Sequence, residues 1–162
     1  MTDKPLISAR DLSVHYPMRG NVLGPKQVVR AVEGVNIDIE RSNFYGLVGE
    51  SGSGKTTLGR AMLKATPITH GDVTYDDGQV RYNLSTLKGA ELKDYRSRAQ
   101  LIFQDPYAAL SPRMTVRDII AEPLEVMGLT KSREETDQRV REIAAKCRLN
   151  LEHLRRFPHA FS

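Results

Sequence analysis

A chain of 162 residues, of which 40% are hydrophobic and 27% charged, is long enough for one α/β domain and has the composition of an ordinary globular protein rather than a disordered or fibrous one. The net charge of +4 arises from 24 basic and 20 acidic residues that are interspersed, so it does not by itself indicate a nucleic-acid partner. Because we find neither a signal-peptide core near Met1 nor a run approaching about 20 apolar residues, we expect no signal peptide and no membrane span.

The first part of the chain predicts two strands of a partly exposed antiparallel layer. Residues 6–16 and 28–40 both alternate apolar and polar side chains. Pro17 and the glycines that follow it predict a loop between them. Residues 41–43 then form a turn that leads into an apolar segment, FYGLV at 44–48, which we interpret as a buried strand.

The next segment, GESGSGKT at 49–56, fits the phosphate-loop pattern G-x-x-x-x-G-K-[ST] and precedes a predicted helix at 56–64. Its glycines allow successive backbone N–H groups to turn towards a phosphate chain, and the helix N-terminus adds its positive dipole. Lys55 is placed to reach the β- and γ-phosphates, and the Thr56 hydroxyl is suited to one position around Mg²⁺. The segment therefore predicts Mg-nucleotide binding.

The middle of the chain predicts a hairpin, a helix and a second buried strand. Short strands at 72–75 and 79–82 flank Asp77-Gly78, a dipeptide typical of tight turns. Residues 89–98 form a plausible amphipathic helix. The apolar segment 99–103 reads as a buried strand that ends in a loop interrupted by prolines.

The last part of the chain is predicted to be helical. A helix over 115–127 is expected to break at Pro123, which lacks an N–H and clashes with the preceding turn. Ser132 and Glu135 form a capping box for a helix over 132–147, on which the single cysteine, Cys147, is expected to pack as a small apolar group. A short helical piece follows at 149–156. One cysteine also excludes an internal disulfide and suits a reducing compartment.

Several segments resemble the ATP-binding-cassette (ABC) ATPases, and in particular the subfamily that energises peptide and nickel importers. The most specific is LIFQDPYAALSPRMTV at 101–116, which is similar to the glutamine loop of that subfamily. The others are HYP at 15–17, VGESGSGKTTLGRA at 48–61, AEPL at 121–124 and RRFPHAFS at 155–162.

This resemblance implies a fold and a division of the chain. The implied fold is α/β, a P-loop NTPase with a RecA-like core, an antiparallel β subdomain and the start of a helical subdomain. One partial ATP-binding domain, 1–162, would comprise a nucleotide-binding core at 1–103, the glutamine loop at 104–114 and the helical start at 115–162. Where the family usually has Gly-Glu before the phosphate-loop strand, this chain has Ser42-Asn43, and we expect the turn to survive because Asn tolerates a left-handed backbone.

The resemblance also assigns site residues. Tyr16 matches the aromatic residue that stacks on adenine, and Gln104 matches the glutamine that contacts Mg²⁺ and positions the attacking water. Thr56 and Gln104 are the implied metal ligands. The implied ATP-binding residues are Tyr16, Gly49, Glu50, Ser51, Gly52, Ser53, Gly54, Lys55, Thr56 and Thr57.

As a member of this subfamily, the chain is expected to bind ATP and Mg²⁺ and to drive solute import from the cytoplasmic face of the inner membrane, as a peripheral subunit. The implied partners are transmembrane permease subunits, a second ATPase subunit and, indirectly, an extracytoplasmic solute-binding protein. No nucleic acid is expected. The resemblance also implies that the solute cannot be identified from this sequence, because selectivity in this family lies in the permease and its solute-binding protein.

In the family, a segment like 155–162 continues into the signature Ser-Gly-Gly-Gln, then an apolar strand that ends in Asp-Glu, and later a histidine switch. The given sequence stops at Ser162, one residue into the signature, so these motifs have no complete counterpart in it. We therefore expect the 162 residues alone to bind nucleotide weakly and to hydrolyse little. Two other readings remain open. In the first, the chain is a regulatory module that binds nucleotide without turnover. In the second, it is a soluble cassette ATPase that is not tied to transport.

Overall fold

The computed structural model describes residues 4–18, 27–105 and 109–161, so part of the loop predicted after Pro17 and the stretch 106–108 lie outside the described residues. The chain divides into two compact units, Met1–Leu101 and Ile102–Ser162.

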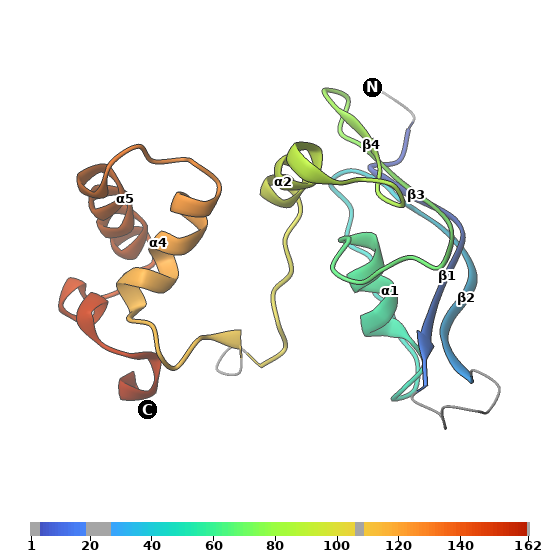
Figure 1. Cartoon of the computed structure of the whole chain (residues 1–162), viewed down its shortest axis with the longest axis horizontal. Helices are drawn as coiled ribbons and strands as arrows, with labels where there is room; N and C mark the ends of the chain where they lie inside the picture. Colours follow the sequence, from blue (N-terminus) through green and yellow to red (C-terminus); the bar gives the residue numbers. More distant parts are fainter. Residues whose placement is uncertain (1–3, 19–26, 106–108, 162) are drawn as a thin grey trace. The chain divides into compact units, whose positions relative to one another are not determined.

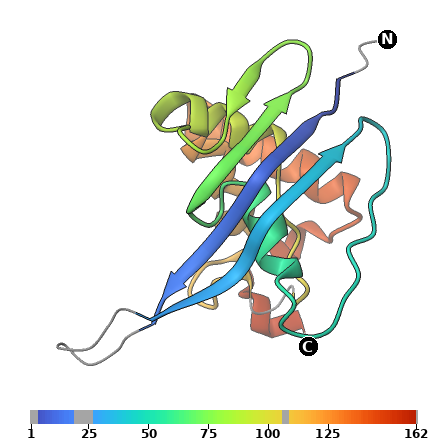
Figure 2. The same cartoon turned by 90° about the vertical axis from the view of Figure 1, so that its right-hand side faces the viewer.

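Four antiparallel strands form one sheet in the first unit, in the order β2-β1-β3-β4 (Figure 1). Figure 2 shows the four strands as one twisted layer. The antiparallel layer and the hairpin predicted around Asp77-Gly78 are confirmed. The strands are β1 (Ile7–Pro17), β2 (Val28–Ile39), β3 (His70–Asp76) and β4 (Arg81–Asn83).

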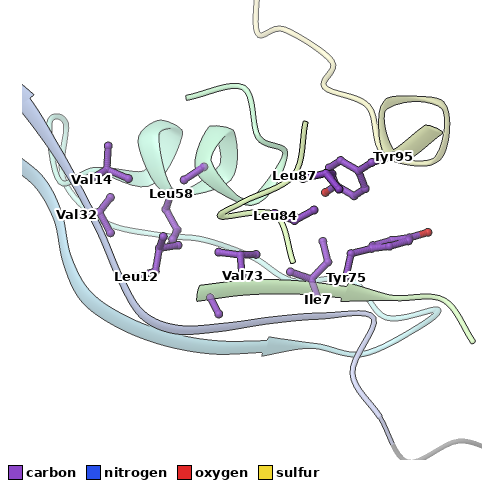
Figure 3. Packing of buried hydrophobic residues seen from close by; sticks show 12 residues of the cluster. Ile7, Leu12, Val14, Val32, Leu58, Val73, Tyr75, Leu84, Leu87 and Tyr95 are labelled. Carbon is purple, nitrogen blue, oxygen red and sulfur yellow. The ribbon is translucent and has the colours of Figure 1, made fainter. Parts of the chain in front are cut away.

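One face of this sheet is covered by helix α1 (Lys55–Met62), which contacts β1 and β2. Leu12 and Val14 of β1 are fully buried, and Leu58 of α1 points towards them (Figure 3). The helix has one apolar side at Leu58 and Ala61, because these positions are three residues apart. Burial of a leucine side chain such as Leu58 contributes about 1.5–3 kcal/mol, so this packing holds α1 against the sheet.

A second helix, α2 (Gly89–Arg98), completes the core through Tyr95, which is fully buried. The Tyr95 hydroxyl donates to the carbonyl of Met62 at 2.7 Å, and its ring meets the edge of the Tyr75 ring with 5.2 Å between centroids. Figure 3 shows Leu87 beside the Tyr95 ring and Tyr75 on the side of the sheet. Burial raises the pKa of Tyr95. The hydroxyl therefore ties α2 to the end of α1 as a neutral donor.

The arginine that ends α2, Arg98, links the helix to the β3–β4 hairpin. Its guanidinium donates to the carboxylates of Asp77 at 2.8 Å and Asp94 at 2.7 Å. Asp77 also accepts from the backbone N–H groups of Val80 and Gln79, which are the main cause that lowers its pKa to about 2. These bonds hold the hairpin turn in place.

We expect Asp77→Asn to lower the melting temperature at pH 7, and the deficit to shrink as the pH falls. The folded pKa of Asp77, about 2, lies below the unfolded value of about 3.9. Its contribution to stability is therefore fully present above the unfolded pKa and is lost between about pH 5 and pH 2. Thermal melts of both proteins from pH 7 to pH 2.5 measure this. A deficit that stays constant over that range would contradict the assignment.

Two predicted strands are absent, and both predictions were wrong. Residues 44–48 and 99–103 belong to no strand of the described chain, and Phe44 and Ile102 are almost fully exposed. A strand is defined by a hydrogen-bonded neighbour, and no described segment pairs with either stretch. The turn before 44–48 does form, but Ser42 rather than Asn43 takes the left-handed conformation, with φ of 57°.

The second unit contains helices α4 (Val116–Val126) and α5 (Arg133–Lys146), followed by the 3₁₀ helices η1 (Leu151–Arg155) and η2 (Pro158–Phe161). Helices α4, α5 and η1 pack together through four buried residues, Ala121, Val140, Ala144 and Leu154. No helix in the described ranges is long and apolar enough to cross a membrane.

Two expectations for this unit were wrong. Helix α4 is continuous through Pro123, because a proline so close to the helix end removes a single hydrogen bond and Met127 N–H still donates to the Pro123 carbonyl at 3.0 Å. Cys147 is exposed rather than packed, since α5 ends at Lys146 and the cysteine follows it as the C-cap. The Ser132 half of the predicted capping box is confirmed, since the Ser132 hydroxyl accepts from Glu135 N–H at 3.2 Å. The Glu135 carboxylate accepts from Lys131 N–H at 2.8 Å.

Candidate functional site

The glycine-rich loop, residues 49–56, leads into α1 and leaves the helix N-terminus open. Gly54 is the N-cap, so no side chain caps the helix, and the first turn contains no acidic residue. Uncapped N–H groups together with the positive end of the helix dipole favour an anion at this position. The described geometry is therefore suited to a phosphate group, as the motif predicts.

Gly54 also fixes how the loop meets the sheet. Its φ is 88°, and a Cβ added there would lie 2.2 Å from the backbone carbonyl oxygen of Ala31 on β2. By contrast, an added Cβ at Gly52, whose φ is 82°, would meet nothing within 4 Å. Only glycine permits this close approach. Sequence reasoning assigned Gly54 to phosphate binding but did not identify its contact with β2.

Lys55 lies over the loop that it belongs to. Its ammonium donates to the carbonyls of Gly49, at 2.7 Å, and Glu50, at 2.5 Å, and lies 3.3 Å from the Ser53 hydroxyl oxygen. The side chain is half-buried. A lysine ammonium has three donors on a flexible stem, so it can exchange one of these acceptors for a phosphate oxygen with little movement. The Lys55 ammonium therefore lies against the phosphate loop, as the motif predicts.

The two threonines of the first helical turn differ in exposure: Thr56 is exposed and Thr57 is half-buried. Mg²⁺ commonly takes only one or two protein oxygens and completes its shell with water and phosphate oxygens. An exposed Thr56 hydroxyl next to a phosphate-binding loop fits such a metal. Glu50 and Ser51 are exposed on the loop as well.

Tyr16 lies near the end of β1, where it pairs with Val29 of β2. Its hydroxyl shares a hydrogen bond of 3.0 Å with the Thr66 hydroxyl, in the segment that follows α1, and 39% of the residue is exposed. The bond holds the ring while part of it remains accessible, which suits stacking on a base. Thr66 was not among the predicted residues, because its partner is 50 positions away in the sequence.

Gln104 belongs to the second unit, whereas the phosphate loop belongs to the first. Its role as a ligand of Mg²⁺ and of the attacking water stays a prediction. Part of the glutamine loop, residues 106–108, lies outside the described residues.

Comparisons with known proteins agree with the motif. The family model described as "ABC transporter" matches residues 32–162. The dipeptide transport ATP-binding protein DppF of Lactococcus lactis subsp. cremoris is 50% identical over 141 residues, covering 86% of this chain and 44% of that protein. The oligopeptide transport ATP-binding protein OppF of Bacillus subtilis is 41% identical over 162 residues, covering 100% of this chain and 50% of that protein.

Among solved structures, a dimeric ATP-binding cassette in a post-hydrolysis state, bound to ADP and Pi, matches with a TM-score of 0.75 and 25% identity. The match covers 96% of this chain and 63% of the cassette. The chain spans about half the length of the curated relatives described above.

These matches confirm the predicted fold class, because the family model covers most of the chain and the solved cassette has the same fold. They also agree with the peptide-importer resemblance of residues 101–116, since both relatives carry peptide-transport names. This chain belongs to the ABC transporter family of ATP-binding proteins.

Proposed function

We propose that this chain carries the ATP site of a subunit that energises the import of peptides or related solutes. The observation that carries the proposal is the phosphate loop, in which the Lys55 ammonium lies against the loop backbone and the helix N-terminus that follows has no side-chain cap. The peptide-transport names of relatives 40–50% identical to this chain support the substrate class.

In this proposal the residues have separate tasks. The backbone of Gly49–Thr57 holds the phosphate chain, with Lys55 as its point charge, and Tyr16 stacks on the base. Thr56 and Gln104 would hold Mg²⁺, which would supply positive charge against the phosphate oxygens. Gln104 would also orient the attacking water, a task for a neutral amide that can both donate and accept.

The proposed partners are transmembrane permease subunits, a second ATPase subunit and, indirectly, an extracytoplasmic solute-binding protein. The matched cassette is dimeric, which supports the second ATPase subunit, and the matched relatives are named as transport proteins. A peripheral position on the cytoplasmic face of the inner membrane follows from this set of partners.

For the 162 residues alone, we propose nucleotide binding without appreciable turnover, because the stretch that enters the phosphate loop, residues 44–48, is not held in a sheet in the described chain. Catalysis requires the reacting groups to be held in place, and an entry segment without sheet partners leaves the loop less well positioned. Titration with a fluorescent ATP analogue and release of inorganic phosphate measure the two steps. A turnover that is sizeable and abolished by Lys55→Ala would overturn the second part of the proposal.

Two variants of Tyr16 test where the base lies in the same titration. Tyr16→Phe keeps the ring and loses only the bond to Thr66, so we expect almost unchanged affinity. Tyr16→Ala removes the stacking surface, which is worth about 1–3 kcal/mol, or roughly 5- to 150-fold in affinity. Equal losses in both variants would show that the hydroxyl, rather than the ring, matters.

A further inference from the structure

His15 is held by three neighbouring residues, although the proposed function assigns it no task. Its Nε2 atom lies 2.6 Å from the Glu33 carboxylate of β2, and its backbone N–H donates to the Thr69 hydroxyl at 2.8 Å. Its ring also meets the ring of His70 edge-on, with 5.7 Å between centroids. Only 15% of the His15 side chain is exposed. The residue therefore joins β1 both to β2 and to the start of β3.

The bond between His15 and Glu33 has a definite direction. A carboxylate can only accept a hydrogen bond, so Nε2 must carry the proton and donate it. The Glu33 side chain is 53% exposed, so water competes for the carboxylate. Such a bond adds little to the free energy of unfolding, but it restricts the two strands that it joins.

The same bond crosses a β-bulge in β2. Val14 pairs with Val32 and His15 pairs with Arg30, which leaves Ala31 as one extra residue on β2. Figure 3 shows the paired side chains of Val14 and Val32 next to each other. A bulge bends its strand and changes the direction of nearby side chains. Because the bond runs from His15 to a residue on the far side of Ala31, it holds the bulge at both ends.

The bulge lies between the two parts of the proposed nucleotide site. Tyr16, the proposed base-stacking residue, follows His15 directly, and the carbonyl of Ala31 is the atom that Gly54 of the phosphate loop approaches. The Tyr16 hydroxyl is bonded to Thr66, but that bond fixes only the far end of the ring. The direction in which the ring leaves β1 depends on how the strand passes the bulge.

We propose that His15 is a positioning residue for base binding, because its bond to Glu33 holds β1 at the bulge so that Tyr16 presents its ring to the base. This inference rests on the proposed function, since it concerns the base of the nucleotide that the phosphate loop would hold. His15 itself does not contact the nucleotide. Loss of the bond therefore weakens a ligand that has a base and leaves a ligand without one unchanged.

The test compares the affinities of the full chain for ATP and for inorganic tripolyphosphate, which has no base, by competition against a fluorescent ATP analogue. We expect His15→Ala to lower the ratio of the ATP affinity to the tripolyphosphate affinity by about 3- to 10-fold, a part of the loss expected for Tyr16→Ala. His15→Gln is the rescue variant, because its side-chain amide can donate from near the position of Nε2. It is expected to restore most of the ratio.

Glu33→Ala breaks the same bond from the other side and is expected to lower the ratio as much. Because Glu33 lines the same cavity as Lys55, removing its charge acts on both ligands and cancels in the ratio. The double variant His15→Ala/Glu33→Ala is expected to lose no more than either single variant, since both substitutions remove one interaction.

Arg10→Ala is the matched control, because it breaks another bond between the same two strands. The Arg10 guanidinium lies 2.7 Å from the Asp38 carboxylate, towards the other end of β1 from Tyr16. This variant is expected to leave the ratio unchanged.

An equal fall in the affinities for ATP and tripolyphosphate in His15→Ala would overturn the proposal, because the bond would then support the sheet and not the base. A fall of the ratio in Arg10→Ala, or no rescue by His15→Gln, would overturn it as well. If the parent chain bound no ATP, the proposed function would fail and this inference with it. If Tyr16→Ala lowered the ratio and His15→Ala did not, only this inference would fail.

Discussion

Replacing Lys55 with alanine is expected to lower the affinity of the chain for ATP by about 10- to 100-fold. A hydrogen bond to a charged group contributes about 1.5–3 kcal/mol, and each 1.4 kcal/mol corresponds to a factor of ten. Lys55 provides the only ammonium seen to donate into the described phosphate loop, through its bonds to Gly49 and Glu50. Because the proposed partners of Lys55 are the β- and γ-phosphates, which AMP lacks, AMP binding is expected to change much less than ATP binding.

Isothermal titration with ATP and AMP measures this difference. Lys146→Ala is the matched control, because it removes a lysine from the last turn of α5 in the other unit. It is expected to leave both affinities unchanged. If Lys55→Ala weakened ATP and AMP equally, the lysine would act on loop structure and not on the terminal phosphates.

Local patterns were sufficient to predict the elements that stabilise themselves or pair with a neighbour in sequence. The hairpin at Asp77-Gly78 is an example, since Gly78 has a φ of 82° and the Asp77 carboxylate accepts from the N–H groups of the turn. The cap at Ser132 is another, with its partner three residues away. In each case the deciding contact lies within a few residues.

The two strands that failed to form, at 44–48 and 99–103, have equally clear apolar patterns. Their composition predicts a buried position, but burial depends on partners that the described chain does not supply. The sequence also failed to predict that α4 continues through Pro123. There the local signal favours a break, but the remaining hydrogen bonds of the helix outweigh the one that the proline removes. Secondary-structure propensity is a property of single residues, whereas a strand or a helix forms only if its backbone hydrogen bonds are made along the whole element.

In the candidate site, the motif predicted the residues that are adjacent in sequence, but it did not predict the long-range contacts that hold them. The motif places Lys55 and the open helix N-terminus together because they are adjacent. The bond from Tyr16 to Thr66 and the approach of Gly54 to Ala31 connect residues far apart in sequence, and no local pattern encodes them. The second of these contacts leads to the other large expected effect.

Gly54→Ala is expected to lower the free energy of unfolding of the first unit by about 3 kcal/mol or more, and Gly52→Ala by only about 1–2 kcal/mol. Both glycines have left-handed φ values, 88° and 82°, so both variants carry the cost of that conformation. Only at Gly54 would the new methyl also lie 2.2 Å from the Ala31 carbonyl oxygen, a backbone atom that cannot rotate away. The loop must then separate from β2.

Urea unfolding of the two variants and the parent chain measures this difference, because the paired design subtracts the conformational cost that both share. Separation of the loop from β2 would also displace Lys55, the next residue, so Gly54→Ala is expected to weaken ATP binding more than Gly52→Ala does. Equal losses of stability in the two variants would mean that the contact with Ala31 does not constrain the loop. The close packing of the phosphate loop on β2 would then have no role in positioning the site.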